Sequence, residues 1–136
     1  MDRRHLEMVL KGAAALDRWR SANPELHLDL SGAKLSGANL AGLNLAHAVL
    51  DNAVLSGADL SGVELTQASL LNADLEGADL RRAVLYRTVF VGANLRDADL
   101  SDAMMYRTNF SRADMRGARL TGVTPLKVIW PDTRTV

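Results

Sequence analysis

Apolar residues recur at every fifth position through most of this chain. Nineteen consecutive fifth positions, from residue 30 to residue 120, hold Leu fifteen times. The other four positions hold Phe or Met: Phe90, Met105, Phe110 and Met115. With each of these positions labelled i, position i−2 is Ala in fourteen repeats and position i−1 is Asp or Asn in ten. Residues 28–122 are therefore nineteen tandem copies of A-(D/N)-L-x-x.

A period of five fits neither a regular helix nor a regular strand. Residues five apart on an α-helix differ by about 140° around the axis, so the leucines would point in every direction. In a strand, an odd period turns each successive Leu to the opposite face. Both conflicts disappear if i−2 and i point inward and the chain turns a corner at i+1 and i+2. Nine of the ten glycines lie at i+2, where such a corner favours a positive φ.

A second period, of twenty residues, predicts the number of sides of this coil. Residues 86–90 (YRTVF) return as residues 106–110 (YRTNF), and only these two repeats combine Thr at i−2 with Phe at i. Matching substitutions twenty residues apart predict that Phe90 stacks on Phe110 in adjacent turns. Because twenty residues are four repeats, we expect nearly five four-sided coils.

The repeat resembles the pentapeptide-repeat family, whose pattern A-(D/N)-L-x-x is matched without a break over residues 28–122. The resemblance implies an all-β solenoid, specifically a right-handed quadrilateral β-helix. The segment Leu16–Arg20, followed by Asn23-Pro24, is similar to the helical lead-in found before the repeats in many members. We expect three segments: an N-terminal capping helix and lead-in (1–27), the β-helix (28–122) and a C-terminal apolar tail or cap (123–136).

Both ends of the repeat need a cover, because an open coil leaves backbone groups unpaired. Residues 3–20 have the apolar spacing of one amphipathic helix that ends before Asn23-Pro24, with Trp19 as a plug on the first coil. Pro125 occupies the next i position and cannot donate to a ladder, so we expect regular pairing to end there. The apolar run after it either folds over the last coil, which we favour, or forms a dimer contact. The candidate end-cap or dimer-contact residues are Trp19, Leu126, Ile129 and Trp130.

Composition and charge narrow the context. The chain has no Cys, which excludes disulfides and thiolate zinc sites. It shows neither a secretory signal nor eighteen consecutive apolar residues, so we expect a cytoplasmic protein with no membrane span. The formal net charge is zero, but residues 28–80 carry −6 and residues 81–136 carry +5. Such segregation can guide association, or it can be variation on a solvated surface.

No group of residues in the sequence points to catalysis, so we predict no enzyme activity, no cofactor and no metal. Of the three histidines, His5 lies on the expected cap helix, His27 in the lead-in and His47 at an outward i+2 position, and no carboxylate pattern marks His47 as a metal ligand. The serines recur at i+1, a position suited to small polar corner residues, and nothing indicates a base to activate them. Asp59, Asp79 and Asp99 should stack in a column that a cation could bridge. In the family that this chain resembles, however, Asp or Asn at i−1 usually bonds the adjacent backbone.

The best candidate for an interaction surface lies in the C-terminal half. Tyr at i+1 and Arg at i+2 occur in both of the matched repeats, so these side chains should point outward and stack. Tyr and Arg are enriched at interface hot spots, and Val and Arg residues on the adjoining sides extend the surface. The alternative is a stabilising ladder in which Arg packs on Tyr. The residues of this candidate surface are Tyr86, Arg87, Tyr106, Arg107, Arg82, Arg112, Val89 and Val91.

Three functions are compatible with these features. The first, which we favour, is a non-catalytic protein-interaction or scaffold module that acts as a monomer on an unknown protein partner. The second is a DNA-mimicking, topoisomerase (gyrase)-protecting protein, because some members of the resembled family shield gyrase as acidic, elongated dimers. The zero net charge and the basic C-terminal half depart from that class. The third is nucleic-acid binding through the Arg-rich half, which the five acids interleaved there disfavour.

Overall fold

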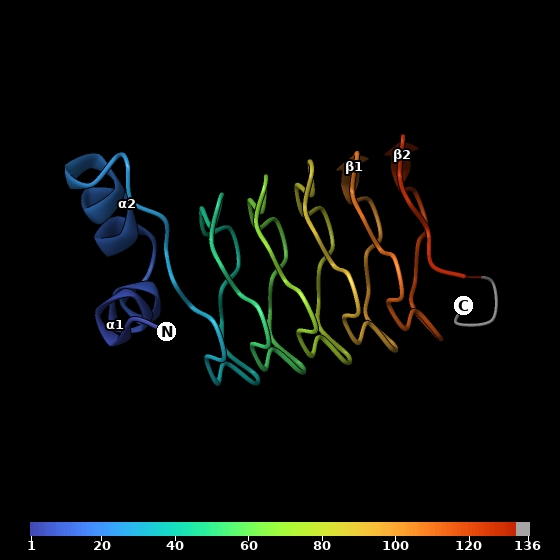
Figure 1. Ribbon diagram of the computed structural model, residues 1–136, viewed down its shortest axis with the longest axis horizontal. Helices are drawn as coiled ribbons and strands as arrows, with labels where there is room; N and C mark the ends of the chain where they lie inside the picture. Colours follow the sequence, from blue (N-terminus) through green and yellow to red (C-terminus); the bar gives the residue numbers. More distant parts are fainter. Residues whose placement is uncertain (133–136) are drawn as a thin grey trace.

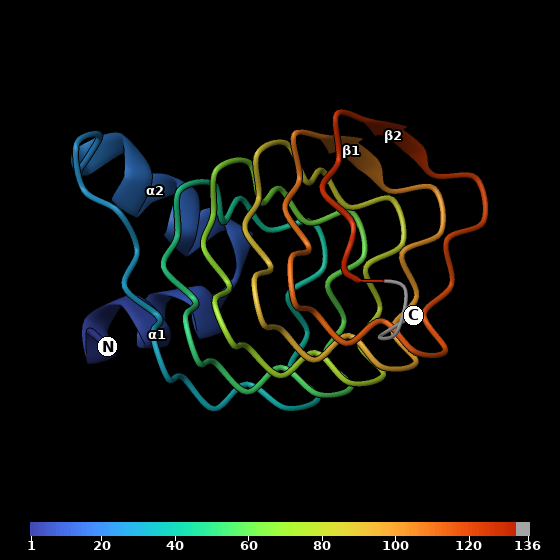
Figure 2. The same ribbon diagram turned by 45° about the vertical axis from the view of Figure 1, so that its right-hand side comes forward.

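The structure, a computed structural model, describes residues 1–132. Two helices at the N-terminus, α1 (Arg3–Lys11) and α2 (Ala13–Ala22), are followed by a backbone that winds in stacked coils (Figures 1 and 2). Two short strands, β1 (Met104–Tyr106) and β2 (Thr124–Leu126), lie in the last coils and pair in parallel. No helix among these residues is long and apolar enough to cross a membrane.

Successive coils pair through one residue per side, twenty residues apart. Parallel bridges join the i−1 positions from Asp29↔Val49 to Asn109↔Ile129. The N–H of an i residue donates to the next coil, as Leu30 does to the Val49 carbonyl at 2.7 Å, while the Val49 N–H donates back to the Leu28 carbonyl at 2.8 Å. The four-sided coil predicted from the sequence is thus confirmed. Because every side is interrupted by a corner after three residues, the ladder consists mostly of single bridges rather than long strands.

The interior of the coil is filled by the side chains at i and i−2. Leu75 and Ala73, in the middle of the solenoid, are both essentially inaccessible to solvent. The Phe90 and Phe110 rings stack with their centroids 5.1 Å apart and their planes 7° apart, as the twenty-residue period predicts. Burying each Leu contributes roughly 1.5–3 kcal/mol, so the repeated core supplies most of the driving force for folding.

The corners require left-handed backbone at i+2. Gly32 has φ 67°, and the same conformation is imposed on non-glycine residues such as Arg107 at φ 53°. Glycine adopts this region without a steric penalty, which explains its enrichment there. Where another residue stands at i+2, the backbone bears a local cost and a side chain projects from the corner.

The N-terminal cap differs from the single helix expected over residues 3–20. It is two helices, because Gly12 adopts φ 99° and ends α1 before α2 begins. The fully buried side chains of the cap are Val9 and Leu16, while Leu10 is 59% exposed. Trp19 packs against the core and is partly buried, while Leu16 is fully buried.

The cap also satisfies backbone groups that the first coil would otherwise leave open. In later coils, the carbonyl at the position equivalent to Asn44 accepts an N–H from the preceding coil, as the Glu64 carbonyl does from Leu45. With no preceding coil here, the Arg20 guanidinium donates to the Asn44 carbonyl at 2.9 and 2.7 Å and to the Ala46 carbonyl at 3.0 Å. Burial lowers the pKa of Arg20, which is consistent with a guanidinium held against the coil.

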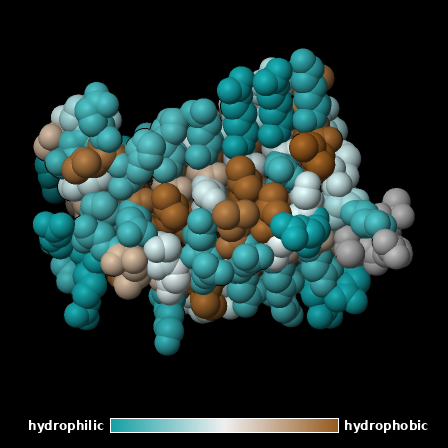
Figure 3. Space-filling view, viewed as in Figure 1, coloured by the Kyte–Doolittle hydropathy of each residue, from teal (hydrophilic) through white to brown (hydrophobic). Residues whose placement is uncertain are grey.

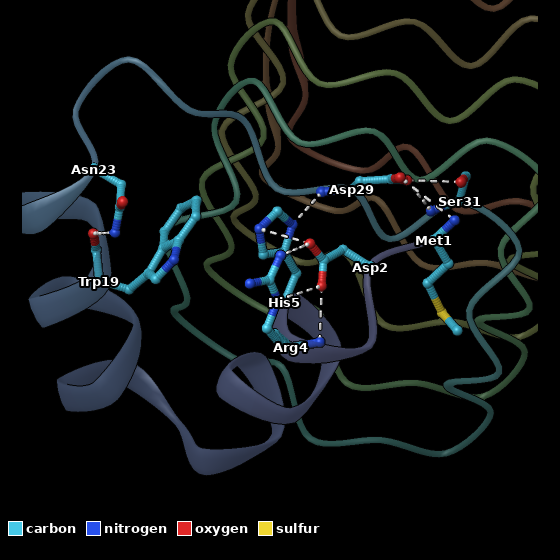
Figure 4. A network of polar contacts seen from close by, with 8 residues as sticks. All are labelled: Met1, Asp2, Arg4, His5, Trp19, Asn23, Asp29 and Ser31. Carbon is cyan, nitrogen blue, oxygen red and sulfur yellow. Dashed lines mark hydrogen bonds and ion pairs between the residues drawn. The ribbon is translucent and has the colours of Figure 1, made fainter.

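A second set of cap contacts converges on Asp29 (Figure 4). The Asp29 N–H donates to His5 Nδ1 at 2.9 Å, and the Asp29 carbonyl accepts from the Asp2 N–H at 3.0 Å. The His5 ring meets Trp19 edge-on, with centroids 4.9 Å apart. These contacts end the ladder at the N-terminal face.

At the C-terminal end, the expectation that regular pairing stops at Pro125 was also wrong. Pairing does not stop at Pro125, because β2 pairs with β1 in the register Met105↔Pro125, and Ile129 bridges to Asn109. An i residue donates its N–H to the coil that follows it, so the missing N–H of Pro125 takes nothing from its pairing with the preceding coil. The apolar run belongs to the solenoid, which extends past the expected boundary at 122. Residues 133–136 of the expected tail lie outside the described residues.

Candidate interaction surface

The four sides of the coil differ in what they present outward. One side, here called the Met104 face, carries five stacked i−1 residues: two polar, then two apolar, then a threonine. In order they are Asn44, Glu64, Val84, Met104 and Thr124. The corner that follows this face carries Tyr86 and Tyr106 at i+1. This face differs from the rest of the coil because two of its repeats lack a hydrogen bond that most repeats make between the i−1 side chain and the main chain.

In most repeats, the i−1 side chain accepts from the main-chain N–H at i+1. Asp79 Oδ1, for example, accepts from the Arg81 N–H at 3.0 Å, and Arg81 also pairs with the same carboxylate at 2.6 Å. Hydrogen bonds from Arg81 hold the pKa of Asp79 below its usual value. An Asp, Asn or Glu oxygen makes this i−1 to i+1 bond in eleven repeats. The exposed carboxylates of the solenoid are thus mainly structural.

The two repeats that carry the tyrosines lack this bond, because Val84 and Met104 hold their i−1 positions. No side chain among residues 1–132 accepts from the N–H of Tyr86 or Tyr106. Instead, the Tyr86 hydroxyl donates to Met104 Sδ at 3.6 Å. In these two repeats, apolar side chains therefore stand where eleven other repeats carry a hydrogen-bonded Asp, Asn or Glu.

These side chains border a groove of about 470 Å³, here called the tyrosine groove. It is lined by Tyr86, Met104, Met105, Tyr106, Thr124, Pro125 and Leu126. Among these residues, Tyr86 is 39% exposed, Met104 40% and Leu126 58%. The groove lies on β1 and β2, and Figure 3 shows hydrophobic side chains at the upper right, where Figure 1 places these strands, and in the middle of the same view.

Beside the groove, three cations project at i+2 from the same corner of three successive coils; together they are called the cation column. They are Arg87, Arg107 and Lys127, with φ of 54°, 53° and 54°. The Arg107 guanidinium lies 5.5 Å from the centroid of the Tyr106 ring. Within residues 1–132, none of the three forms an ion pair. This corner has no Gly in any coil, since His47 and Gln67 occupy its earlier positions, so a side chain projects at every level.

The structure therefore gathers half of the predicted surface into one site. Tyr86, Arg87, Tyr106 and Arg107 share the corner of the Met104 face.

The other predicted residues lie on neighbouring elements. Val89 is on the next face, with Val91 and Arg112 at its corner, and Arg82 is at the opposite edge of the Met104 face. Leu126 and Lys127 were missed as members of the site. Their position twenty residues after Tyr106 and Arg107 was the available signal, which the expected stop at Pro125 concealed.

The other groups noted in the sequence form no site of this kind. His27 and His47 stack with centroids 5.3 Å apart. The Asp59, Asp79 and Asp99 column does form, but its carboxylates accept from Ser61, Arg81 and Ser101. Among the described residues, no group of three or more His, Cys, Asp or Glu side chains could hold a metal ion.

Comparisons with known proteins agree with this architecture. A family model described as pentapeptide repeats matches with eight copies, over residues 29–67, 58–97 and 83–122. A pentapeptide repeat protein from the Arabidopsis thaliana thylakoid lumen is 31% identical, with a TM-score of 0.66, and the match covers 68% of this chain and 65% of that one. No curated protein matches the chain.

Two cyanobacterial structures are also similar. Rfr23, a pentapeptide repeat protein from Cyanothece 51142, is 34% identical, with a TM-score of 0.43, and the match covers 76% of this chain and 64% of that one. The protein alr5209 from Nostoc PCC 7120 is 29% identical, with a TM-score of 0.42, and the match covers 82% of this chain and 93% of that one. The chain spans less than two thirds of the length of the Arabidopsis protein and of Rfr23.

Proposed function

The chain belongs to the pentapeptide repeat family, and we propose that it is a non-catalytic protein-interaction module whose partner binds at the tyrosine groove and the cation column. Proteins of this family form right-handed quadrilateral β-helices, and we infer the same hand for this coil. We further propose that the chain binds its partner as a monomer.

The observation that carries this proposal is the apolar stretch of the Met104 face where the i−1 side chains do not bond the main chain. Tyr86, Met104 and Leu126 are each more than a third exposed, and they lie together around one groove. A contiguous apolar patch with a polar rim is typical of interaction sites. Tyr and Arg are also, with Trp, the side chains enriched at the hot spots of protein interfaces.

The rigidity of the coil adds to this argument. The backbone on either side of the groove is held by inter-coil bonds, such as Leu85 N–H to the Met104 carbonyl at 2.8 Å and Arg107 N–H to the Leu126 carbonyl at 2.9 Å. A surface that is already ordered loses little conformational entropy on binding. The groove can thus present its side chains in one fixed arrangement.

A quantitative pull-down tests the proposal. Wild type is compared with the double variant Tyr86→Ala/Arg107→Ala and with a control, Leu71→Ala/Arg112→Ala, which removes an exposed apolar residue and a corner cation from the next face. We expect proteins captured by the wild type and by the control to be lost with the groove variant. Equal recovery by all three proteins would remove the groove as the binding surface.

The gyrase-protecting alternative stays a prediction, and no feature of the surface favours it. The acids of residues 28–80 are spread over all four sides: Asp59 and Asp79 lie on one, Glu64 on the Met104 face, and Asp74 and Asp29 on the remaining two. Most of them bond the main chain of their own repeat. A gyrase supercoiling assay with and without a quinolone tests this function, and no effect at excess protein would discard it.

A further inference from the structure

We propose that the tyrosine groove and the cation column bind an extended, acidic peptide segment that inserts a bulky apolar side chain into the groove. This inference rests on the proposed function, because it names the chemistry of the partner for the same surface. Three features of the site point to that chemistry: main-chain N–H groups to which no side chain of residues 1–132 is bonded, cations that no carboxylate of the same residues pairs with, and an apolar groove.

The first feature is the missing internal carboxylate. In eleven repeats, an acidic or amide oxygen from i−1 accepts from the N–H at i+1, as Asp114 Oδ1 does from Arg116 at 3.2 Å. At Tyr86 and Tyr106 that oxygen is absent, because Val84 and Met104 replace the acceptor. A partner carboxylate can take the same place, since a carboxylate is a strong acceptor for main-chain donors.

The second feature is the cation column. Arg87, Arg107 and Lys127 stack at the strand spacing, about 4.8 Å between coils, so each cation faces another of like charge. No carboxylate among residues 1–132 pairs with any of them. Each also occupies a left-handed corner position that costs a non-glycine residue conformational energy, whereas nine of the corner positions on the other sides of the coil hold Gly. Acidic groups laid along the column would relieve the repulsion.

The third feature is the groove itself, which separates this surface from a simple anion site. Its walls are the side chains of Tyr86, Met104 and Tyr106, and its C-terminal end is formed by Pro125 and Leu126. At about 470 Å³, it has room for a side chain of the size of Leu or Phe. Burial of such a side chain would anchor the segment, while the charges would set its orientation.

The same residues favour a peptide over a single-stranded nucleic acid. Bases bind by stacking on open aromatic faces along a continuous basic groove. Here the Arg107 guanidinium already lies over the Tyr106 ring, and the Tyr86 hydroxyl is bonded to Met104. At the opposite edge of the Met104 face, the corner residue Asp102 is acidic, which interrupts a basic track for phosphates.

Fluorescence anisotropy with a short, labelled synthetic peptide in which Glu alternates with Leu tests the proposal. Two control peptides replace Glu by Gln or Leu by Ala, and a labelled single-stranded oligodeoxynucleotide is measured in parallel. We expect saturable binding of the Glu-Leu peptide and about tenfold weaker binding of each control peptide. We also expect the oligodeoxynucleotide not to compete.

Protein variants locate the site. Arg87→Gln/Arg107→Gln should weaken binding of the Glu-Leu peptide about tenfold, and Tyr86→Ala/Tyr106→Ala should weaken it at least as much. Arg112→Gln, which removes one corner cation of the same coil on the next face, should leave affinity unchanged. Circular dichroism and melting temperature verify that each variant folds, and the Arg variants keep the test valid if the Tyr variant does not.

The outcomes separate this inference from the proposed function. No binding of the Glu-Leu peptide, or equal binding of the Gln peptide, overturns the acidic partner, while groove-dependent capture in the pull-down would leave the interaction module standing. Competition by the oligodeoxynucleotide at the same residues would replace the peptide by a nucleic acid. Concentration-dependent self-association that is lost on Tyr86→Ala/Tyr106→Ala would show that a second copy of the chain occupies the groove.

Discussion

Trp130 lies parallel to Phe110, with ring centroids 5.5 Å apart and planes 7° apart, and thereby adds a third ring to the Phe90–Phe110 stack. Phe110 is fully buried, whereas Trp130 is 40% exposed. Trp130 therefore covers Phe110 on the side that faces the solvent. The apolar C-terminal run is thus a final part of the coil that shields the core.

Replacing Trp130 should therefore destabilise the solenoid from its C-terminal end. We expect Trp130→Ala to lower the free energy of unfolding by about 2 kcal/mol, less than for a fully buried aromatic because part of the ring is exposed. Urea denaturation measures the change, and Ile129→Ala, which removes an outward side chain, should cost much less. An unchanged midpoint, or a dimer in light scattering that the substitution dissolves, would favour the dimer contact instead.

The N-terminal cap should depend on the Arg20 guanidinium. Arg20→Ala removes all three bonds to the Asn44 and Ala46 carbonyls and should cost about 1.5–3 kcal/mol, as for hydrogen bonds to charged groups. Hydrogen exchange should show faster exchange in the first coil than around Leu100. The exposed Arg18, replaced by Ala, is the control. Uniform exchange in both regions would contradict a local role of Arg20.

The interior requires apolar side chains at i. Leu75 is fully buried, so Leu75→Asp should leave an unpaired charge in the core and unfold the domain, a loss of more than about 4 kcal/mol. Leu71→Asp makes the same change at a corner that is 37% exposed and should be tolerated. Circular dichroism and thermal melting compare the two variants, and a folded Leu75→Asp protein with an unchanged melting temperature would refute the inward placement.

Corner glycines should differ in their tolerance of a methyl group. A Cβ on Gly117 would lie 2.1 Å from Asp97 Oδ1, whereas a Cβ on Gly77, at the same corner, would meet nothing within 4 Å. Both positions have positive φ, so Gly77→Ala should cost about 1 kcal/mol and Gly117→Ala clearly more. Denaturant titration measures both, and Asp97→Gly should rescue most of the excess in Gly117→Ala. Equal costs at the two glycines would show that the Asp97 side chain simply moves aside.

Stability should fall in acid as structural carboxylates are protonated. Hydrogen bonds from the Arg116 side chain hold the pKa of Asp114 at about 2, and bonds from the Arg81 side chain lower that of Asp79. A carboxyl group with a lowered folded-state pKa stabilises fully above its unfolded pKa, near 4, and loses this contribution as the pH falls toward about 2. Melting temperatures between pH 6 and pH 2 test this, and Asp79→Asn/Asp114→Asn should flatten the decline. An identical decline in this variant would assign the effect to other groups.

How far the sequence predicts this protein varies along the chain. The coil was predictable because Leu at i and Ala at i−2 repeat without a break and each corner depends on its own residues. The candidate surface was predictable only in part. Tyr106 and Arg107 stand out by repetition, whereas the role of Met104 depends on a hydrogen bond that its repeat does not make. Gly12 divides the cap because its φ of 99° is incompatible with a continuous helix, and periodicity alone does not reveal it.

The sequence by itself determined the square coil, its inward residues and the stack of Phe90 on Phe110, because side-chain direction and corner geometry repeat locally every five residues. Only the tertiary structure decided how the coil ends. Whether Pro125 stops a ladder depends on the direction of its missing N–H, and in the last coil that direction leads away from the preceding coil. The tertiary structure likewise decided that Leu126 and Lys127 join the tyrosine groove and the cation column, because that requires the chain to complete one more turn.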